Sequence, residues 1–490
     1  MPDFRNERCV AFEIAKSGYP SAPPFNPDQQ YPEYSGEIGG DRNEVYGAIR
    51  KLFMNLELDK ENIGRQGWNP LGCIIKPGQQ VLIKPNIVLH KNLAGSSVEA
   101  VITHGSVIRV VVDYVIKALG GTGRIVIGDA PIQQCDFEKA TRVSGLWQVV
   151  EFYRSRNVRI DLMDFRLVTS AHSASGIRSA MSGDPEGYSH VDLDGASHHC
   201  SDCSAFSPTH YDITRDFDRF RVTNYDPDFM KRHHNKDKHE YIIANSALHA
   251  DTLISIPKLK THRKAGISIN LKNMVGINGH KDCLPHHSKG SKEEGGDEYP
   301  RKSRLKRALT VIQEMEDVLE APYARVFLKI PKRILYLLLR AVLRDGFYEG
   351  SWWGNDTLWR TVLDLNTIAY YWNVRAQRTG EEQQRQFLSI VDGVIAGEGE
   401  GPLEPTARKI GLVAAGQNPA AVDIACATVM GFDWRRIPLL RNALGLYADF
   451  AAEEILAVSS QAEFSGAVVG EGRQSYAFVP SKGWLGHIEV

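Results

Sequence analysis

The 490-residue chain has few cysteines and no apolar run long enough to span a membrane. Its seven cysteines, an odd number scattered along the sequence, do not form the paired framework of a small secreted domain. No uninterrupted apolar stretch approaches the roughly 20 residues of a membrane-spanning helix. The first residues show no apolar secretory segment and carry charges at Asp3, Arg5, Glu7 and Arg8. We therefore expect a protein of the reducing cytoplasm.

The chain also lacks an excess of charge of either sign. Its formal net charge is -1, which excludes the strongly basic balance of a general nucleic-acid binder. Hydrophobic residues make up 42% and charged residues 24% of the sequence, as in an ordinary globular enzyme. The length allows two or three domains, or one large α/β domain with insertions.

What the sequence does contain is a polar stretch attached to a buried strand, over residues 253 to 299. The stretch begins with an apolar run typical of a central sheet strand, which Pro257 ends. Lys258, Lys260 and His262 follow at a spacing of two, which on an extended chain places their side chains on one face. Such cations repel one another unless an anion or carboxylates lie between them. The pattern therefore predicts a phosphate or carboxylate site, and a solvated basic loop is the alternative.

Two polar residues interrupt the apolar segment GISINLKNMVGIN that follows. These are Lys272 and Asn273. A buried polar group without a partner costs about 1–3 kcal/mol, so each needs a compensating interaction. This favours the ligand site over the solvated loop.

Histidines and acidic residues gather in the second half of the same stretch. His280, Asp282, His286, His287 and Asp297 are ligand types that suit zinc, iron, nickel or manganese. Adjacent histidines on an extended chain point in opposite directions, so at most one of His286 and His287 is expected to join His280. The stretch thus also allows a divalent metal site, and a solvated polar loop is again the alternative. The Cys200-x-x-Cys203 pair lacks a second pair and only weakly indicates zinc.

Polar side chains follow two predicted strands in the N-terminal half. The strand 80–83 is followed by Lys84 and Asn86, and the strand 124–128 is followed by Asp129. Between them lies a predicted helix that Thr103 caps, with His104 in its first turn. A strand, helix and strand of this length form a right-handed βαβ unit, so these side chains should share one edge near a helix N-terminus, where anions bind favourably. A simple helix cap is the alternative role for Asp129.

A third strand end is predicted in the C-terminal half. The strand 387–391 is followed by Asp392 and by a glycine-rich loop that carries Glu398 and extends to Pro402. Glycines let a backbone approach a ligand closely, and the carboxylates suit a cation or sugar hydroxyls. The loop lacks the lysine and hydroxyl residue of a P-loop. Asp423, on an otherwise apolar helix, is expected to be a buried structural carboxylate.

The region 303–344 has helical periodicity. Within 325–344 the basic side chains fall on about a third of the helix circumference, and apolar residues fill most of the rest. Such a helix can lie on an anionic membrane surface, and packing against the sheet or a second subunit is an equal alternative. Pro331 is expected to kink it. The basic residues are Arg325, Lys329, Lys332, Arg333, Arg340 and Arg344.

These elements predict an α/β fold with a mixed or mostly parallel sheet, helices on both faces, insertions and a helical subdomain. Ligands of open α/β sheets bind at the carboxyl ends of the strands, so we expect the polar segments to share one opening. The predicted organisation is an N-terminal arm (1–45), an α/β half (46–167), a polar insertion (168–240), the core strand with its Lys/His-rich segment (241–300), a helical subdomain (301–375) and a C-terminal α/β half (376–490).

In these segments the sequence resembles the family called domain of unknown function 362. The resemblance covers most of 80–435 in the family's order. The family is named for its lack of an assigned activity, so the resemblance implies a fold and not a reaction. The segments that carry it are VLIKPNIV at 81–88, Thr103-His104, IVIGDAP at 125–131, ISIPKLKTHRKAGISINLKNMVG at 254–276, IVDGVIAGEGEGP at 390–402 and AAGQNPAAVDIACATVMGFD at 414–433.

Two departures from the family pattern affect what the resemblance implies. Some members carry a ferredoxin-like module with clustered cysteines, which this sequence lacks, so no iron–sulfur cluster is expected. Thr103-His104 is followed by Gly105 where the family usually has proline.

Fold analogy also points to the nickel-pincer lactate racemases. Longer members with segments such as NGHKD and GGDEY resemble those found beside polysaccharide biosynthesis genes.

The leading hypothesis is an enzyme that acts on an anionic small molecule, such as a phosphorylated or nucleotide-linked sugar of polysaccharide biosynthesis. A histidine suits proton transfer there, because its ordinary pKa of about 6.5 lies near neutral pH. The predicted catalytic residues are His262, His280, Lys260 and Asp392. The predicted substrate-binding residues are Lys84, Asn86, His104, Asp129, Lys258, Lys272, Asn273 and Glu398.

Two other hypotheses compete with this one. The first is a metal-dependent redox or racemase-like enzyme whose divalent metal is held by His280, Asp282, His286 and His287. The second is a peripheral membrane scaffold of a polysaccharide assembly, which would contact the membrane surface through the helix 325–344.

Overall fold

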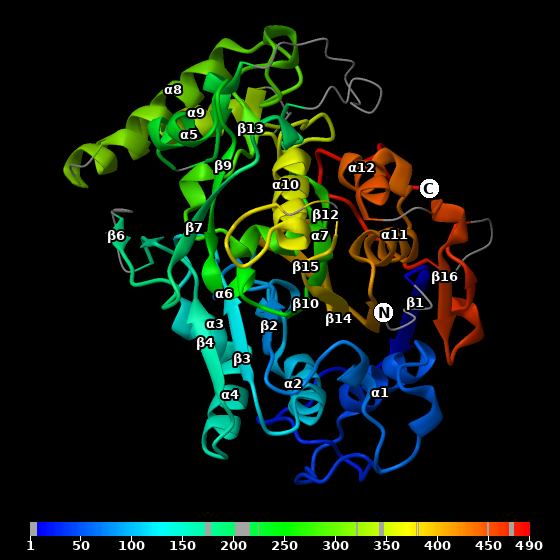
Figure 1. Cartoon of the computed structure of the whole chain (residues 1–490). Helices are drawn as coiled ribbons and strands as arrows, with labels where there is room; N and C mark the ends of the chain where they lie inside the picture. The colour runs from blue at the N-terminus through cyan, green and yellow to red at the C-terminus, as the bar shows by residue number, and fades with distance from the viewer. Residues whose placement is uncertain are drawn as a thin grey trace.

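An 11-stranded sheet forms the centre of the molecule in the computed structural model (Figure 1). The structure describes residues 7–171, 178–200, 216–223, 225–319, 322–342, 347–378, 380, 382–447, 450–469 and 475–490. The strands of the central sheet are β1 (Cys9–Ile14), β2 (Gln80–Pro85), β3 (Arg124–Asp129), β4 (Ile160–Asp164), β10 (Thr252–Ile256), β11 (Lys258–His262), β12 (Gly266–Ser268), β14 (Gln386–Glu400), β15 (Glu404–Gly416), β16 (Leu456–Ser459) and β17 (Gly466–Ala467).

The sheet is mixed and mostly parallel, as predicted. Its main path runs β17-β16-β1-β15-β14-β10-β2-β3-β4, and β11 and β12 join it through β14. The neighbours from β14 through β10, β2 and β3 to β4 are all parallel, whereas β15 is antiparallel to both β14 and β1. The parallel half places the carboxyl ends of β2, β3 and β10 at one edge.

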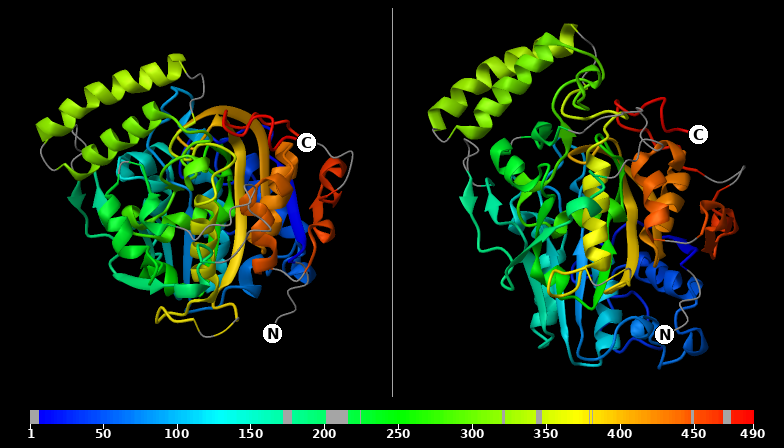
Figure 2. Two further views of the ribbon diagram at one scale, coloured as in Figure 1. Left: turned by 90° about the horizontal axis from the view of Figure 1, so that it is seen from above. Right: turned by 45° about the horizontal axis from the view of Figure 1, so that its top comes forward.

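Helices cover both faces of this sheet (Figure 2). The helices are α1 (Glu44–Asn55), α2 (Gly105–Leu119), α3 (Phe137–Val143), α4 (Leu146–Arg154), α5 (Pro227–His233), α6 (Asn245–Leu248), α7 (Asn270–Asn273), α8 (Arg304–Val318), α9 (Pro322–Val342), α10 (Leu358–Tyr371), α11 (Pro419–Met430) and α12 (Pro438–Tyr447). Strand alternation explains the two layers. On β2, Leu82 packs with α7, α10, α11 and α12, whereas Val81 and Ile83 pack with α1, α2 and α4.

The region 168–240 adds small sheets beside the large one. Its strands are β5 (Val168–Thr169), β6 (Ser179–Ala180), β7 (Tyr188–Asp192), β8 (Phe220–Arg221) and β9 (Glu240–Ala244), and β13 (His287–Ser288) pairs with β8. Cys200 is described, but Cys203 lies outside the described residues, as do 172–177 and 201–215.

The N-terminal arm packs on the body of the protein. Tyr19 stacks on His104 with ring centroids 3.9 Å apart, and Phe25 lies 5.0 Å from the same ring. Strand β1 inserts between β15 and β16, so the two ends of the described chain complete one side of the sheet.

Helix α2 begins one residue later than predicted. Its N-cap is His104, whose ring accepts a hydrogen bond from the Ser106 backbone N–H. Thr103 was expected to cap the helix, but its hydroxyl donates to the Ile256 carbonyl and accepts from the Asn86 N–H. The threonine therefore joins β2 to β10 instead.

The prediction of a glycine-rich loop after Asp392 is wrong for residues 393–400, which belong to strand β14, and only Gly401 and Pro402 lie in the turn that follows. Two of the glycines serve close packing. A Cβ at Gly397 would lie 2.8 Å from the Ala100 carbonyl oxygen, and one at Gly401 would lie 2.0 Å from that of Thr261. Asp392 therefore lies within a strand and not at its end.

The predicted helical region 303–344 is a pair of helices, α8 and α9, which pack against each other and stand out from the body of the protein (Figure 1). Pro331 lies inside α9. Among the described helices, none has the length and apolar content needed to cross a bilayer.

Candidate functional site

A cavity of about 850 Å³ lies at the carboxyl ends of β2 and β3. Residues 262–286, the turn between β14 and β15, and α9 complete its walls. This is the edge at which an open α/β sheet places its ligands. The cavity volume falls in the range of about 300–1,000 Å³ that is usual for small-molecule sites.

Asp129 lines the cavity and forms a buried ion pair with Lys84 behind the wall, with 2.8 Å between Nζ and Oδ1. The second oxygen of Asp129 accepts from the Ile87 N–H at 2.6 Å. Gly276 covers the pair, and a Cβ there would lie 1.9 Å from the carboxylate and 2.6 Å from the ammonium. Burial lowers the pKa of Lys84, while the charge of Asp129 opposes that shift. Asp129 is thus a partner of Lys84 and not a helix cap.

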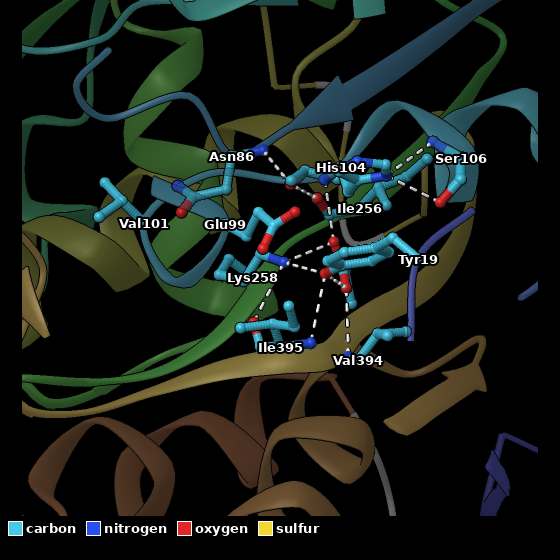
Figure 3. A network of polar contacts seen from close by, with 12 residues as sticks. Tyr19, Asn86, Glu99, Val101, His104, Ser106, Ile256, Lys258, Val394 and Ile395 are labelled. Atoms are coloured by element: carbon cyan, nitrogen blue, oxygen red, sulfur yellow. Dashed lines mark hydrogen bonds and ion pairs between the residues drawn. The ribbon is translucent and has the colours of Figure 1, made fainter. Parts of the chain in front are cut away.

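A second buried ion pair joins Lys258 and Asp392, and Figure 3 shows Lys258 with its neighbours Tyr19 and His104. The Lys258 Nζ is 2.6 Å from Asp392 Oδ2 and donates to the Tyr19 hydroxyl at 2.6 Å. That hydroxyl donates to Asp392 Oδ1, and the His104 N–H donates to Oδ2 at 3.0 Å. Burial lowers the pKa of His104 to about 3, so its ring is neutral. None of these four residues lines the cavity.

Two asparagines join the Lys84–Asp129 pair to Lys260. The Lys260 ammonium donates to Asn86 Oδ1 at 2.7 Å and to the Val101 carbonyl at 2.5 Å. Asn273 Oδ1 accepts from both Lys84 and Asn86. Burial, with the charges of Lys258 and Lys272, holds the pKa of Lys260 well below its usual value. Both asparagines reach the cavity wall, whereas Lys84 and Lys260 lie behind it.

A second set of basic residues lines the cavity without carboxylate partners. We call Lys264, Lys272, Lys281, His262 and His286 the cationic cluster. Lys264 donates to the Thr223 hydroxyl at 3.1 Å, and Lys281 donates to the Val275 carbonyl at 3.2 Å. Among the described residues, no carboxylate lies within ion-pair distance of the three lysines, and Lys272 has no polar partner at all.

Burial dominates the electrostatics of the cluster, and the charges of Glu349 near Lys264 and of Asp129 near Lys272 and Lys281 oppose its effect only in part. Burial lowers the pKa of Lys264 and of Lys272 to about 8, and that of Lys281 to about 7. In Lys272, the nearby charge of Lys264 adds to the effect of burial. An anion placed among them would reverse these shifts, because an opposite charge favours the protonated amine.

His262 presents a hydrogen-bond donor to the cavity. Its Nδ1 accepts from the backbone N–H groups of Lys264 and Ala265 at 3.1 and 3.2 Å. Burial, reinforced by the charge of Lys272, holds the pKa of His262 well below its usual value. A neutral imidazole whose Nδ1 accepts carries its proton on Nε2. The ring can therefore donate a hydrogen bond but has no free lone pair.

His286 has the opposite arrangement. Its Nδ1 lies 2.6 Å from the Leu284 carbonyl oxygen, which can only accept, so the ring proton is on Nδ1. Burial, with the charges of Lys272 and Lys264, keeps the pKa of His286 well below its usual value. The Nε2 lone pair of this neutral ring is therefore available as a base. Sequence reasoning placed His286 only among the candidate metal ligands.

The proposed metal ligands are not brought together. His280 Nδ1 and Asp282 Oδ1 are 3.9 Å apart, but Asp282 is already paired with Arg178 and accepts from Gln133. His280 stacks on Phe229 with ring centroids 3.9 Å apart and does not line the cavity.

His287 and Asp297, which were also proposed as metal ligands, lie outside the cavity. Buried His287 lies in β13. Asp297 accepts from Ser288, Asp356 and Thr357.

Only one group of three ligand atoms with metal-like spacing occurs in the described part of the chain. It comprises His190, His233 and Glu240. Both imidazoles contact the Glu240 carboxylate, and the Lys238 ammonium lies 3.3 Å from the same oxygen. A lysine in that position competes with a metal for the carboxylate.

Two acidic residues singled out in the sequence have structural partners outside the cavity. Glu398 pairs with Arg408 at 2.7 Å and accepts from the Val479 N–H. Asp423 accepts from the backbone N–H groups of Asn270 and Leu271 and thereby holds α7, which carries Lys272. Burial raises the pKa of Asp423 to about 7.

Sequence reasoning did not select three residues that shape the site. Lys264 and Lys281 lie in the stretch that it identified, but they stand among other charged and imidazole residues, so the sequence did not single them out. Tyr19 gave no signal, because its role depends on the fold of the N-terminal arm against Asp392, 373 residues away.

The segments that build this site are those of a known family. The model described as Domain of unknown function (DUF362) matches residues 81–181 and 195–428. These ranges include both ion pairs and the whole cationic cluster, but not Tyr19. The chain belongs to this family. The description of the family assigns no activity to its members.

The remaining comparisons add no activity. No curated protein matches the chain. A crystal structure of a protein from Thermotoga maritima is similar over 77% of this chain, with 10% sequence identity and a TM-score of 0.29. The match covers 58% of that protein, so this chain spans less than two thirds of its length.

Proposed function

We propose that the protein is an enzyme that binds an anionic small molecule in the cavity at the carboxyl ends of β2 and β3. The main observation that supports this proposal is the cationic cluster, in which three lysines face one cavity and no described carboxylate lies in ion-pair contact with them. Like charges held together in a partly desolvated site oppose folding. An anionic ligand would offset that repulsion, which supports binding as the reason for the arrangement.

Within this proposal the residues divide into two roles. Lys264, Lys272 and Lys281 contact the anion, with His262 Nε2–H as a further donor. His286 Nε2 accepts a proton from the substrate. Lys84, Lys258 and Lys260 lie behind the cavity wall and position the strand ends, whereas Asn86, Asn273 and Asp129 reach the wall.

Other features of the cavity wall support a phosphorylated or nucleotide-linked sugar as the substrate class. Tyr225, Tyr336 and Tyr348 offer rings on which a base or sugar can pack, and Glu349 and Glu400 offer acceptors for hydroxyl groups. The chain also resembles longer family members that are found beside polysaccharide biosynthesis genes, which supports the same substrate class. Cys9, Cys73, Cys135, Cys283 and Cys426 are free thiols, which suits a cytoplasmic location.

Isothermal titration calorimetry with pyrophosphate and a panel of nucleotide-linked sugars tests the proposal. We expect Lys272→Gln and Lys281→Gln each to weaken binding by about 10- to 100-fold, the loss expected for a hydrogen bond to a charged group. Lys139→Gln changes a lysine whose side chain is 72% exposed and serves as the matched control. Binding that is absent in the parent protein, or equal in parent and variants, would refute the proposal.

The role of His286 has a separate test. Once a substrate is identified, His286→Gln should retain binding and lower kcat, because glutamine fills the space but offers no basic nitrogen. His262→Gln should weaken binding instead, since His262 only donates. Equal kcat in His286→Gln and the parent would exclude His286 as the base.

A further inference from the structure

Helix α9 carries an exposed apolar face that no described part of the chain covers. Tyr323 is 80% and Phe327 76% exposed, and four more apolar side chains are also exposed, at Ile330, Ile334, Leu337 and Leu338. At about 100° per residue, all six fall within an arc of about 100°. They form one continuous strip along the helix, which we call the α9 strip.

The opposite side of α9 is already packed against the protein. Leu339 is 5% exposed and, with Lys332 and Tyr336, lines the cavity. Lys332 also pairs with Glu316 of α8 at 2.9 Å. The helix is therefore held in place by one side, and the α9 strip is the side that remains available.

The charge around the α9 strip has a single sign. Lys329 and Arg333 are exposed and lie along one edge of the strip. From Ala321 to Arg344 the sequence contains six lysine or arginine residues and no aspartate or glutamate. The side chains of Arg325 and Arg340, and residues 343–346, lie outside the described part of the structure.

We infer that the α9 strip docks the protein on the surface of an anionic lipid bilayer. An amphipathic helix with aromatic and aliphatic residues on one side and cations at the edge lies in the membrane interface, where it gains both apolar burial and attraction to anionic headgroups. A two-fold contact between copies of α9 would bring cations together with no acidic residue of this helix to neutralise them. The bilayer supplies both the apolar layer and the negative charge.

Docking would place the cavity beside the membrane, because α9 forms part of its wall. Val311 and Met315 of the adjacent α8 are also exposed and enlarge the apolar surface of this helix pair. Figure 2 shows both helices at the outer edge of the molecule, away from the central sheet. The inference does not depend on which anion the cavity binds.

Cosedimentation with vesicles tests the inference. We expect the full-length protein to bind vesicles of phosphatidylcholine mixed with phosphatidylglycerol and to stay in the supernatant with pure phosphatidylcholine. The double variant Lys329→Gln, Arg333→Gln should bind about 30-fold more weakly, from the contribution of two cations near an anionic surface. Phe327→Ser, Ile334→Ser should lose binding by a similar factor or more.

Matched controls change residues of the same type elsewhere. Lys139→Gln, Lys231→Gln and Val374→Ser alter exposed or half-exposed positions outside α9 and should bind vesicles like the parent. Protein that stays in the supernatant with anionic vesicles overturns the inference. So does self-association that is lost in the Phe327→Ser, Ile334→Ser variant without any vesicle binding, because the α9 strip would then contact a second copy.

Pyrophosphate titration of the same variants separates this inference from the proposed function. Variants of the α9 strip should bind pyrophosphate like the parent, because their substitutions face away from the cavity. Loss of vesicle binding with retained pyrophosphate binding supports docking through α9. Absence of pyrophosphate binding in the parent would refute the anion proposal and leave the vesicle result unchanged.

Discussion

Buried and half-buried lysines occur in two neighbouring groups in this protein, and the groups differ in how their charge is balanced. Lys84 and Lys258 each contact a carboxylate, at 2.8 and 2.6 Å. Lys264, Lys272 and Lys281 contact only neutral oxygens or no polar atom among the described residues. The comparison separates two uses of a buried lysine. A paired lysine stabilises the fold, whereas an unpaired lysine facing a cavity is available to a ligand.

The largest effect is expected from Lys84→Met. The substitution leaves Asp129 buried without its cation, which should lower the free energy of unfolding by about 3–5 kcal/mol. Urea denaturation measures the loss. Adding Asp129→Asn should recover part of it, because the uncompensated charge is removed. If the free energy of unfolding fell by less than about 1 kcal/mol, the pair would not be a structural requirement. The distinction between paired and unpaired lysines would then be wrong.

Lys272→Met should change the free energy of unfolding in the opposite direction at pH 7. Burial lowers the pKa of Lys272 to about 8 in the folded protein, below its ordinary value of 10.5, so the protonated lysine opposes folding. Replacing it should leave the free energy of unfolding unchanged or raise it by about 1 kcal/mol or more. Urea denaturation at pH 7 measures this change in the free energy of unfolding. Destabilisation as large as that of Lys84→Met would show that Lys272 has a structural partner.

Anion binding should weaken as the pH rises. The pKa values of Lys281 and Lys272 are about 7 and about 8 without ligand, and a bound anion raises them. Below these values the lysines are protonated before binding, so affinity is highest there. Above them, binding requires proton uptake, and affinity should fall by up to about tenfold per pH unit for each lysine.

Sulfate is a suitable ligand for this measurement, because it does not titrate near neutral pH. Calorimetry across the range should show the decline in the parent protein and a shallower decline in Lys272→Met. An affinity that does not change with pH would contradict the lowered pKa values of the cationic cluster.

The smallest effect is expected from Glu398→Gln. Glu398 contacts Arg408 at the surface, outside the cavity, and such pairs contribute about 0.2–1 kcal/mol. Sulfate and pyrophosphate affinities should not change. A clear loss of affinity would return Glu398 to the binding site that the sequence suggested for it.

Much of the fold could be predicted from the sequence, because its signals are local. Apolar runs ending in polar residues located β2, β3 and β10, and the helix between β2 and β3 predicted a parallel unit. The glycine-rich segment was misinterpreted, because a glycine that serves close packing looks the same as one in a loop. Only the neighbours of Gly397 and Gly401 in the folded protein distinguish the two.

The sequence by itself determined that basic and imidazole side chains are concentrated in residues 258–287, next to a buried strand. Tertiary structure alone decided which of them are neutralised. Lys258 and Lys272 look equivalent in the sequence, but Lys258 meets Asp392 134 residues away, whereas Lys272 meets no described carboxylate. The charge state of a buried group depends on what lies within a few ångströms of it, and strand pairing across the whole chain sets those neighbours.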